Sequence, residues 1–171
     1  MTRTQEQLDA GYLLDRDSGV IDVWWPYQPQ VGRYTGKIGA EQTDGRLSQL
    51  VCRDPRGGAP PLHIHHREDE TFYVIAGEIT FFVGDQRMEA TAGDFVFAPK
   101  DVSHGFLVTS DHAEYLTSFS PAGVERFFAE VAPSVVPGES GPSPSEPDPE
   151  EFARIAASYG IEIVGPPATL D

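Results

Sequence analysis

The sequence predicts an all-β domain followed by short helices. Short apolar runs recur along most of the chain, and Gly, Pro, Asp and Gln separate them. Short runs with turn residues between them are typical of a β-sandwich or a β-barrel. At 171 residues, of which 39% are hydrophobic, the chain is long enough to bury one core and form one domain.

Apolar runs in the N-terminal part predict the first strands. Asp44-Gly45 is a hairpin signal between two of these runs. The neighbouring residues Trp24 and Trp25 favour a core or interface position over a pocket wall. The runs cover residues 12–14, 20–25, 34–38 and 47–53.

The middle of the chain predicts the strands at the centre of the fold. Gly77 and Gly93 mark turns between them. Pro99 ends a strand because it cannot donate a hydrogen bond to a β-ladder. The expected strands cover residues 71–76, 79–83, 87–90, 95–98, 104–108 and 114–120.

After residue 120 the apolar spacing becomes that of a helix. Ser120 and Pro121 predict the start of this helix. A stretch rich in Pro, Ser, Gly and Glu predicts a linker, and Asp148 then predicts the cap of a second helix that packs on the barrel. We therefore expect a core with its following helix over residues 1–132, a linker over 133–149, and a helix and tail over 150–171.

Composition excludes several classes of partner. The chain has 27 acidic and 12 basic residues and a net charge of −15, which argues against nucleic acid and anionic membranes as partners. It has no apolar stretch long enough to span a membrane and no signal peptide at its N-terminus. The single cysteine, Cys52, cannot form an internal disulfide, so we expect a buried thiol and a cytoplasmic location.

Three histidines and one glutamate form a candidate metal site. His63 and His65 are two residues apart, so a β-strand would point both to the same face. Glu70 follows shortly after, and His104 lies in a second short block. Imidazole and carboxylate together suit one divalent transition metal, and Ni, Fe, Mn, Co, Cu and Zn all remain open. Adjacent His66 should point to the opposite face.

The same alternation predicts the lining of a substrate pocket. If His104 faces the metal, Phe106 and Val108 face the cavity, and Glu70 brings Phe72 and Val74 with it. This pocket would be apolar around a polar centre, as expected of a small-molecule site. Glu68 and Asp69 are expected to be solvated loop charges, with a role in orienting the ligands as the alternative.

These residues resemble the two conserved motifs of the cupin superfamily. Gly57, His63, His65, Glu70 and Gly77 match the first motif at every spacing. In the second motif Gly93, Pro99 and His104 match, while Asp101 replaces a Gly and Val108 replaces an Asn. Asp tolerates positive φ better than most residues, so Asp101 is compatible with the turn.

The resemblance implies a jelly-roll β-barrel, also called a double-stranded β-helix, with His63, His65, Glu70 and His104 as metal ligands. Residues 93–100 and 120–128 resemble a narrower group, the small single-domain quercetin dioxygenases of actinobacteria. That group implies cleavage of a flavonol by O2 with loss of carbon monoxide, Glu70 as the catalytic base, and a homodimer. The alternatives are a cupin enzyme for another aromatic or polyketide-like compound, and a non-enzymatic, metal-dependent module that binds a small ligand.

Overall fold

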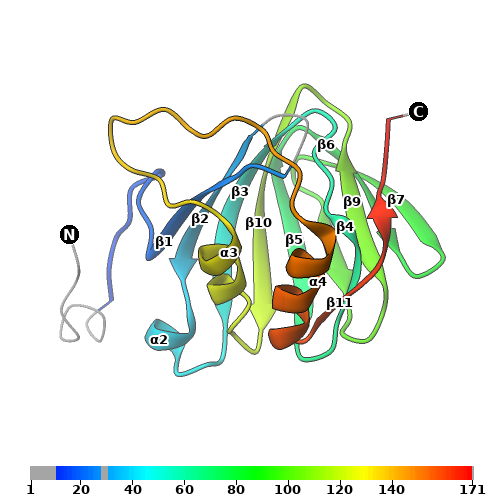
Figure 1. Ribbon diagram of the computed structural model, residues 1–171, viewed down its shortest axis with the longest axis horizontal. Helices are drawn as coiled ribbons and strands as arrows, with labels where there is room; N and C mark the ends of the chain where they lie inside the picture. The colour runs from blue at the N-terminus through cyan, green and yellow to red at the C-terminus, as the bar shows by residue number, and fades with distance from the viewer. Residues whose placement is uncertain (1–10, 28–30, 171) are drawn as a thin grey trace.

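A computed structural model describes residues 11–27 and 31–170 and shows two antiparallel β-sheets that enclose one core (Figure 1). The first sheet has six strands in the order β1-β2-β3-β10-β5-β8. This arrangement confirms the predicted all-β jelly-roll fold. Its strands are β1 (Ile21–Trp25), β2 (Gly32–Ile38), β3 (Ser48–Pro55), β10 (His112–Ser120), β5 (Asp69–Ala76) and β8 (Phe95–Ala98).

The second sheet has five strands in the order β11-β4-β9-β6-β7. Its edge strand β11 comes from the C-terminal tail, where the sequence predicted no strand. Gly165 and two prolines hide the strand pattern, but prolines are tolerated at a sheet edge because no ladder hydrogen bond is needed on the outer side. The strands are β4 (Pro61–His65), β6 (Glu78–Val83), β7 (Gln86–Thr91), β9 (His104–Val108) and β11 (Ile161–Pro167).

The connection between β2 and β3 differs from a simple hairpin. A short helix, α2 (Ala40–Thr43), precedes the predicted turn at Asp44-Gly45, where both residues have positive φ. The two strands still pair antiparallel. The expected strand at residues 12–14 is wrong, because this segment crosses the outside of the first sheet without joining it.

Side chains from both sheets and from the helices form the core. Cys52 is buried there, as predicted, and Trp25 is buried too, although it also forms part of a cavity wall, which the sequence interpretation did not favour. The ring of Trp25 stacks on Tyr34 with a centroid distance of 5.2 Å and contacts Phe128 edge-on at 5.5 Å. Each fully buried aromatic side chain of this kind contributes about 2–3 kcal/mol to folding, so this cluster is a main source of stability.

Two helices follow the barrel strands, α3 (Glu125–Val131) and α4 (Pro149–Ser158). The start predicted for α3 is wrong, because Ser120 is still the last residue of β10 and its hydroxyl donates to the carbonyl of Arg46. Asp148 caps α4 as predicted, accepting hydrogen bonds from the backbone N–H groups of Glu150 and Glu151. Both helices lie in front of the strands at the centre of Figure 1.

Residues 135–148 contain no helix or strand and connect the two helices. This chain segment is tied to β1 by the bridge between Val23 and Ser134 and by the hydrogen bond from Val135 N–H to Asp22 O. The division of the chain into three parts stays a prediction. In the described residues no helix has the length and apolar character needed to cross a membrane.

Candidate metal centre

Three strands bring the four predicted residues together. His63 and His65 lie on β4, Glu70 on β5 and His104 at the start of β9. One ligand atom from each of the four lies within 4.8 Å of those from the other three. Glu70, His65 and His104 are buried and His63 is partly buried. Their assignment as metal ligands stays a prediction.

Strand register explains why side chains distant in sequence converge. His63 pairs directly with His104 across β4 and β9, and their ring centroids are 4.5 Å apart. The turn before β9 contains Asp101 at a φ of 62°, so the expectation that Asp replaces Gly at a positive φ is confirmed. The N–H of Asp101 donates to the carbonyl of His65 at 2.8 Å, which fixes this turn against β4.

The imidazole rings are oriented by backbone carbonyls. Nδ1 of His63 lies 2.8 Å from the carbonyl oxygen of Pro61, and Nδ1 of His104 lies 3.0 Å from that of Val102. Because a carbonyl oxygen only accepts, each Nδ1 must carry the hydrogen. Nε2 of His104 then faces Oε2 of Glu70 at 2.9 Å, where a proton or a cation must hold the two atoms together.

Thr117 orients the carboxylate of Glu70. Its hydroxyl donates to Oε1 of Glu70 at 2.8 Å, while Oε2 faces His104 and lies 3.4 Å from Nε2 of His65. Sequence analysis missed Thr117. Its position on the inward face of β10 carries a signal, because a polar residue there needs a partner in the core.

Glu68 corrects the sequence interpretation, because it is buried rather than solvated. It is 3% exposed, and its Oε2 lies 3.4 Å from Nδ1 of His65. Neither of these two atoms has a hydrogen-bond partner among the described residues. Asp69 instead lies at the surface, where its carboxylate accepts from the N–H of Lys100 at 3.0 Å. The ligand-orienting alternative therefore fits Glu68 and not Asp69.

The charge states of His63 and Glu70 suit a cation, and that of His65 depends on the two carboxylates beside it. Burial and the neighbouring His104 and His65 lower the pKa of His63 to about 3, which leaves its imidazole neutral. Burial opposes the charge of Glu70, but hydrogen bonds from His104 and His65 outweigh it and hold the pKa of its carboxyl well below the usual range. Burial also opposes the charge of His65, yet contacts with Glu68 and Glu70 raise its pKa to about 9. A neutral imidazole and an ionised carboxylate are the forms that bind a divalent metal, so His63 and Glu70 fit one as they stand, whereas His65 is protonated at neutral pH and would release a proton when a metal binds.

A cavity of about 70 Å³ adjoins the cluster and is lined mainly by aromatic side chains. Phe72 and Phe106 line it, as the strand alternation predicted. Val74 and Val108 do not line it; both are fully buried in the core, one alternation step further along β5 and β9 from Glu70 and His104 than Phe72 and Phe106 are. Side chains from α3 and α4 complete the wall, including Phe127 and Phe152, whose ring centroids are 5.5 Å apart.

A buried carboxylate lies behind this cavity. Asp54 accepts hydrogen bonds from the hydroxyls of Tyr115 at 2.7 Å and Tyr34 at 3.1 Å. Both tyrosines and Cys52 line the cavity. Burial raises the pKa of Asp54 to about 6. Sequence analysis missed this group because its members come from three strands that only the fold brings together.

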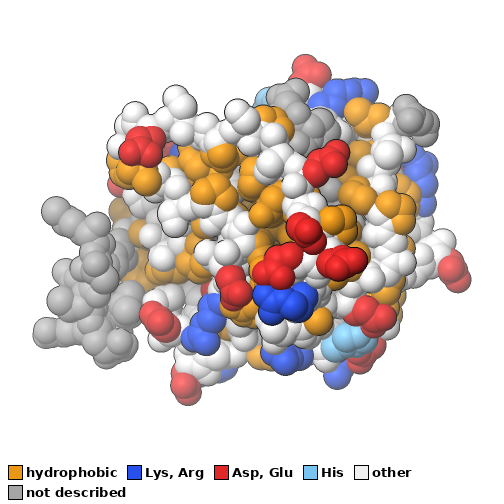
Figure 2. Space-filling view, viewed as in Figure 1, with side chains coloured by type: hydrophobic (Ala, Val, Ile, Leu, Met, Phe, Trp, Pro, Cys, Tyr) orange, Lys and Arg blue, Asp and Glu red, His pale blue; other side chains and the backbone are white. Residues whose placement is uncertain are grey.

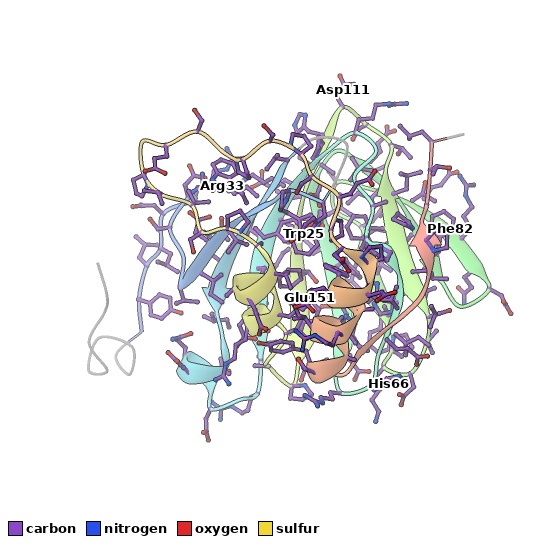
Figure 3. All side chains as sticks on the ribbon, in the orientation of Figure 1. Trp25, Arg33, His66, Phe82, Asp111 and Glu151 are labelled. Carbon is purple, nitrogen blue, oxygen red and sulfur yellow. The ribbon has the colours of Figure 1, made fainter. Side chains whose placement is uncertain are left out.

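His66 lies outside the cluster, as predicted. Its ring nitrogens face the carboxylates of Asp101 at 2.8 Å and Glu162 at 2.9 Å on the surface. Figure 3 shows it at the periphery, away from Trp25 at the centre of the fold. This position makes His66 a useful control for the adjacent His65.

Comparisons with known proteins agree with this architecture. The profile of the cupin domain matches residues 49–119, which contain the complete cluster. Residues 49–119 form a cupin domain. The chain is 28% identical over 115 residues to quercetin 2,3-dioxygenase of Bacillus subtilis, a match that covers 67% of this chain and 33% of the relative. An uncharacterised protein of Streptomyces coelicolor is 32% identical over 56 residues, covering 33% of this chain and 53% of that protein.

Solved structures share this fold at low identity. KdgF from a Halomonas species superimposes with a TM-score of 0.53 at 20% identity and covers 60% of this chain and 91% of its own. A predicted oxalate decarboxylase from Thermotoga maritima gives a TM-score of 0.56 at 20% identity, covering 64% of this chain and 99% of its own. Since this chain spans only about a third to a half of its curated relatives, their activities apply to it only as proposals.

Proposed function

We propose that this cupin is a metal-dependent dioxygenase that cleaves a flavonol or a related aromatic compound with O2. The observation that carries the proposal is the cluster of three histidines and one glutamate at the wall of an aromatic cavity. The similarity to quercetin 2,3-dioxygenase of Bacillus subtilis supports the reaction and the substrate class.

One divalent transition metal per chain would be held by His63, His65, Glu70 and His104. Their nitrogen and oxygen donors suit Ni, Fe, Mn, Co, Cu or Zn. When bound, such a metal supplies a Lewis acid for a substrate oxygen. Four protein ligands leave one or two positions open on a five- or six-coordinate metal.

Glu70 is the proposed catalytic base. Oε2 of its carboxylate points into the cluster, while the hydroxyl of Thr117 holds Oε1. A carboxylate in this position can take the proton of a flavonol hydroxyl, because it is ionised and within reach of the proposed metal site. Phe72 and Phe106 would orient the substrate ring and exclude water from it.

The size of the cavity sets a condition on this proposal. A volume of about 70 Å³ has room for about two water molecules, whereas pockets for drug-sized ligands hold on the order of 300 Å³ or more. A flavonol therefore fits only if the wall formed by Phe127 of α3 and Phe152 of α4 moves outward. Loops and helices that cover active sites commonly move in this way on the microsecond to millisecond scale.

The small cavity also favours a second candidate, a metal-dependent module that binds a small ligand without converting it. This candidate needs the same metal cluster but no movement of the helices. A third possibility is an enzyme for another aromatic or polyketide-like compound, which would use the same aromatic wall. Turnover of quercetin separates the first candidate from the other two.

The test begins with protein stripped of metal and reloaded separately with Ni, Co, Mn and Fe. Oxygen uptake and carbon monoxide release are measured with quercetin as the substrate. Rapid uptake with equimolar carbon monoxide supports the proposal. If a protein shown to bind one ion per chain takes up no oxygen with any of the four metals, the flavonol dioxygenase proposal is wrong.

Matched variants test the residue assignments. We expect His63→Ala, His65→Ala and His104→Ala to lose bound metal, and His66→Ala to keep it, because His66 lies at the surface. Metal content is read by elemental analysis of folded protein. Equal metal content in all four variants would refute the ligand assignment. Glu70→Gln should keep most of its metal and lose activity; a fully active Glu70→Gln variant would refute the base role.

A further inference from the structure

A second polar group lies at the wall of the aromatic cavity, and the proposed reaction does not use it. It consists of the carboxylate of Asp54 on β3 and the hydroxyls of Tyr34 on β2 and Tyr115 on β10. Both tyrosines line the cavity, whereas Asp54 lies behind them and is 2% exposed. We call these three residues the Asp54 group.

The surroundings of the Asp54 group are mostly apolar. Acidic and basic side chains are scattered over the outer surface around α3 and α4, the two helices that complete the cavity wall (Figure 2). Behind these helices most side chains of the cavity wall are aromatic or aliphatic. A carboxylate buried in such surroundings is costly unless hydrogen bonds satisfy it. The hydrogen bonds of Asp54 therefore decide how its neighbours are oriented.

Both tyrosines direct their hydroxyl hydrogens at Asp54. Oδ2 of Asp54 accepts from the hydroxyl of Tyr115 at 2.7 Å and from that of Tyr34 at 3.1 Å. Burial and the nearby Asp54 raise the pKa of each tyrosine well above its usual range, so both hydroxyls keep their hydrogen at neutral pH. Each hydroxyl has only one hydrogen, so neither tyrosine has a hydrogen left for a ligand.

The other contacts of Asp54 lock this arrangement. Its Oδ1 is buried and has no hydrogen-bond partner among the described residues. Oδ1 lies against Gly32 of β2, where an added Cβ would clash with it. Within the part of the chain that the structure describes, the two tyrosine hydroxyls are the hydrogen-bond donors to this carboxylate. Turning either hydrogen toward the cavity would take a donor from a buried carboxylate, which is costly.

We propose that the hydroxyl oxygens of Tyr34 and Tyr115 form a subsite that accepts a hydrogen bond from a hydroxyl of the ligand. The subsite selects aromatic compounds that carry a hydroxyl on a ring away from the metal. This inference rests on the proposed function, because the ligand is the flavonol-like compound bound at the metal cluster. Asp54 is a positioning residue, since it acts on the ligand only through the two tyrosines.

Hydrogen-bond chemistry sets this selectivity. A tyrosine oxygen that donates its hydrogen to a carboxylate keeps lone pairs that accept, and hydrogen bonds in a chain strengthen one another. A ligand hydroxyl completes such a chain, whereas an ether or carbonyl oxygen has no hydrogen to donate. Sites built to pair with a ligand hydroxyl discriminate strongly against analogues that lack it.

The position of the subsite suits a ligand whose central ring meets the metal cluster. Thr117, which holds Glu70, and Tyr115 lie on the same inward face of β10. Asp54 pairs with Ala113 of that strand. The strand from Thr117 to Ala113 is roughly 14 Å long, at about 3.4 Å per residue. A flavonol carries its outer hydroxyls on rings that flank the metal-binding ring, and this separation would place one of them within reach of the subsite.

The test compares two flavonols that differ in their outer hydroxyls. Quercetin has hydroxyls on both outer rings, whereas 3-hydroxyflavone keeps the hydroxyl and the carbonyl that would face the metal and has none on the outer rings. Affinities are measured by isothermal titration calorimetry of Ni-loaded protein under nitrogen, so binding is read without turnover. We expect the wild type to bind quercetin about tenfold more tightly than 3-hydroxyflavone.

Tyr115→Phe and Tyr34→Phe each remove one hydroxyl. Each should weaken quercetin binding about 3- to 10-fold, the effect of one hydrogen bond, and change the binding of 3-hydroxyflavone less than about twofold. Tyr27→Phe is the matched control, because the hydroxyl of Tyr27 donates to the carbonyl of Val131 and its ring does not line the cavity. It should leave both affinities unchanged. Near-ultraviolet circular dichroism checks that each variant is folded.

Asp54→Asn tests the positioning role. An amide at this position can donate to one tyrosine oxygen, which turns the hydrogen of that hydroxyl toward the cavity. The preference for quercetin over 3-hydroxyflavone should therefore fall about threefold or more. An unchanged preference in the folded variant overturns the role of Asp54.

The outcomes separate this subsite from the proposed reaction. A loss confined to quercetin in either tyrosine variant supports the subsite. Equal weakening of both flavonols overturns it, because the tyrosines would then only shape the wall, and so does wild-type quercetin affinity in both variants. If the wild type binds quercetin but takes up no oxygen with it, the reaction is wrong and the variants still decide the subsite. If it binds neither flavonol, both proposals are wrong.

Discussion

Glu68 provides the sharpest test of the proposed metal centre. It is 3% exposed and faces Nδ1 of His65 at 3.4 Å. A carboxylate beside the outer nitrogen of a ligating histidine keeps the hydrogen on that nitrogen and leaves the other nitrogen for the metal. Glu68→Gln keeps the size of the side chain and removes its charge, so it isolates this effect.

Loss of such an outer partner weakens metal binding by about 10- to 100-fold, which corresponds to about 1.4–2.7 kcal/mol. We expect Glu68→Gln near the lower end, because an oxygen able to accept stays beside Nδ1 of His65 and only the charge is lost. Glu68→Ala should lie near the upper end, because it removes the acceptor altogether. The dissociation constant of Co or Ni is measured by competition with a chelator of known affinity.

Asp69→Asn is the matched control. Asp69 is adjacent in sequence, but its carboxylate binds the N–H of Lys100 outside the cluster, so we expect unchanged metal affinity. The reasoning is refuted if folded Glu68→Gln binds metal as tightly as the wild type. It is also refuted if Asp69→Asn weakens metal binding equally, because the effect would then be one of general charge.

Three further predictions concern stability. Gly77→Ala should lower the free energy of unfolding by more than about 3 kcal/mol, because φ is 86° and the new Cβ would lie 2.3 Å from the carbonyl oxygen of His112. Gly93 also has a positive φ, of 98°, but a new Cβ there would meet no atom within 4 Å. Gly93→Ala should therefore lower the free energy of unfolding clearly less than Gly77→Ala does. Equal losses in urea unfolding would contradict the steric argument. Since the pKa of Asp54 is raised from 3.8 to about 6, the folded state retains a proton that the unfolded chain releases, and stability falls as pH rises through this window. The stability of Asp54→Asn relative to the wild type should therefore rise by about 2 kcal/mol between pH 4 and pH 7, and a constant difference would show that the carboxyl titrates normally. Phe152→Ala should lower the free energy of unfolding at pH 7 by about 3–5 kcal/mol, because it removes a buried ring from the cavity wall. A loss below about 1 kcal/mol would show that α4 is not part of the core.

Strand positions and the four clustered residues could be predicted from the sequence because both depend on local spacing. Alternation places His63 and His65 on one face of any β-strand, whatever that strand pairs with. Helix starts depend on tertiary contacts as well as on local residues. The cap at Asp148 follows from its own side chain, whereas the start expected at Ser120 was wrong because tertiary pairing keeps Ser120 in β10.

Only the tertiary structure decided the features that depend on strand order and register. The burial of Glu68 and the contact between Thr117 and Glu70 join residues whose distance in space no local pattern specifies. Likewise, strand order decided that the C-terminal tail pairs with β4 and that Phe95 of β8 pairs with Tyr73 of β5. The sequence by itself determined which residues could form the fold and a metal site, because alternation and turn chemistry act over a few residues. The contacts between distant residues and the aromatic cavity were decided by the packing of the two sheets, which brings together segments far apart in the chain.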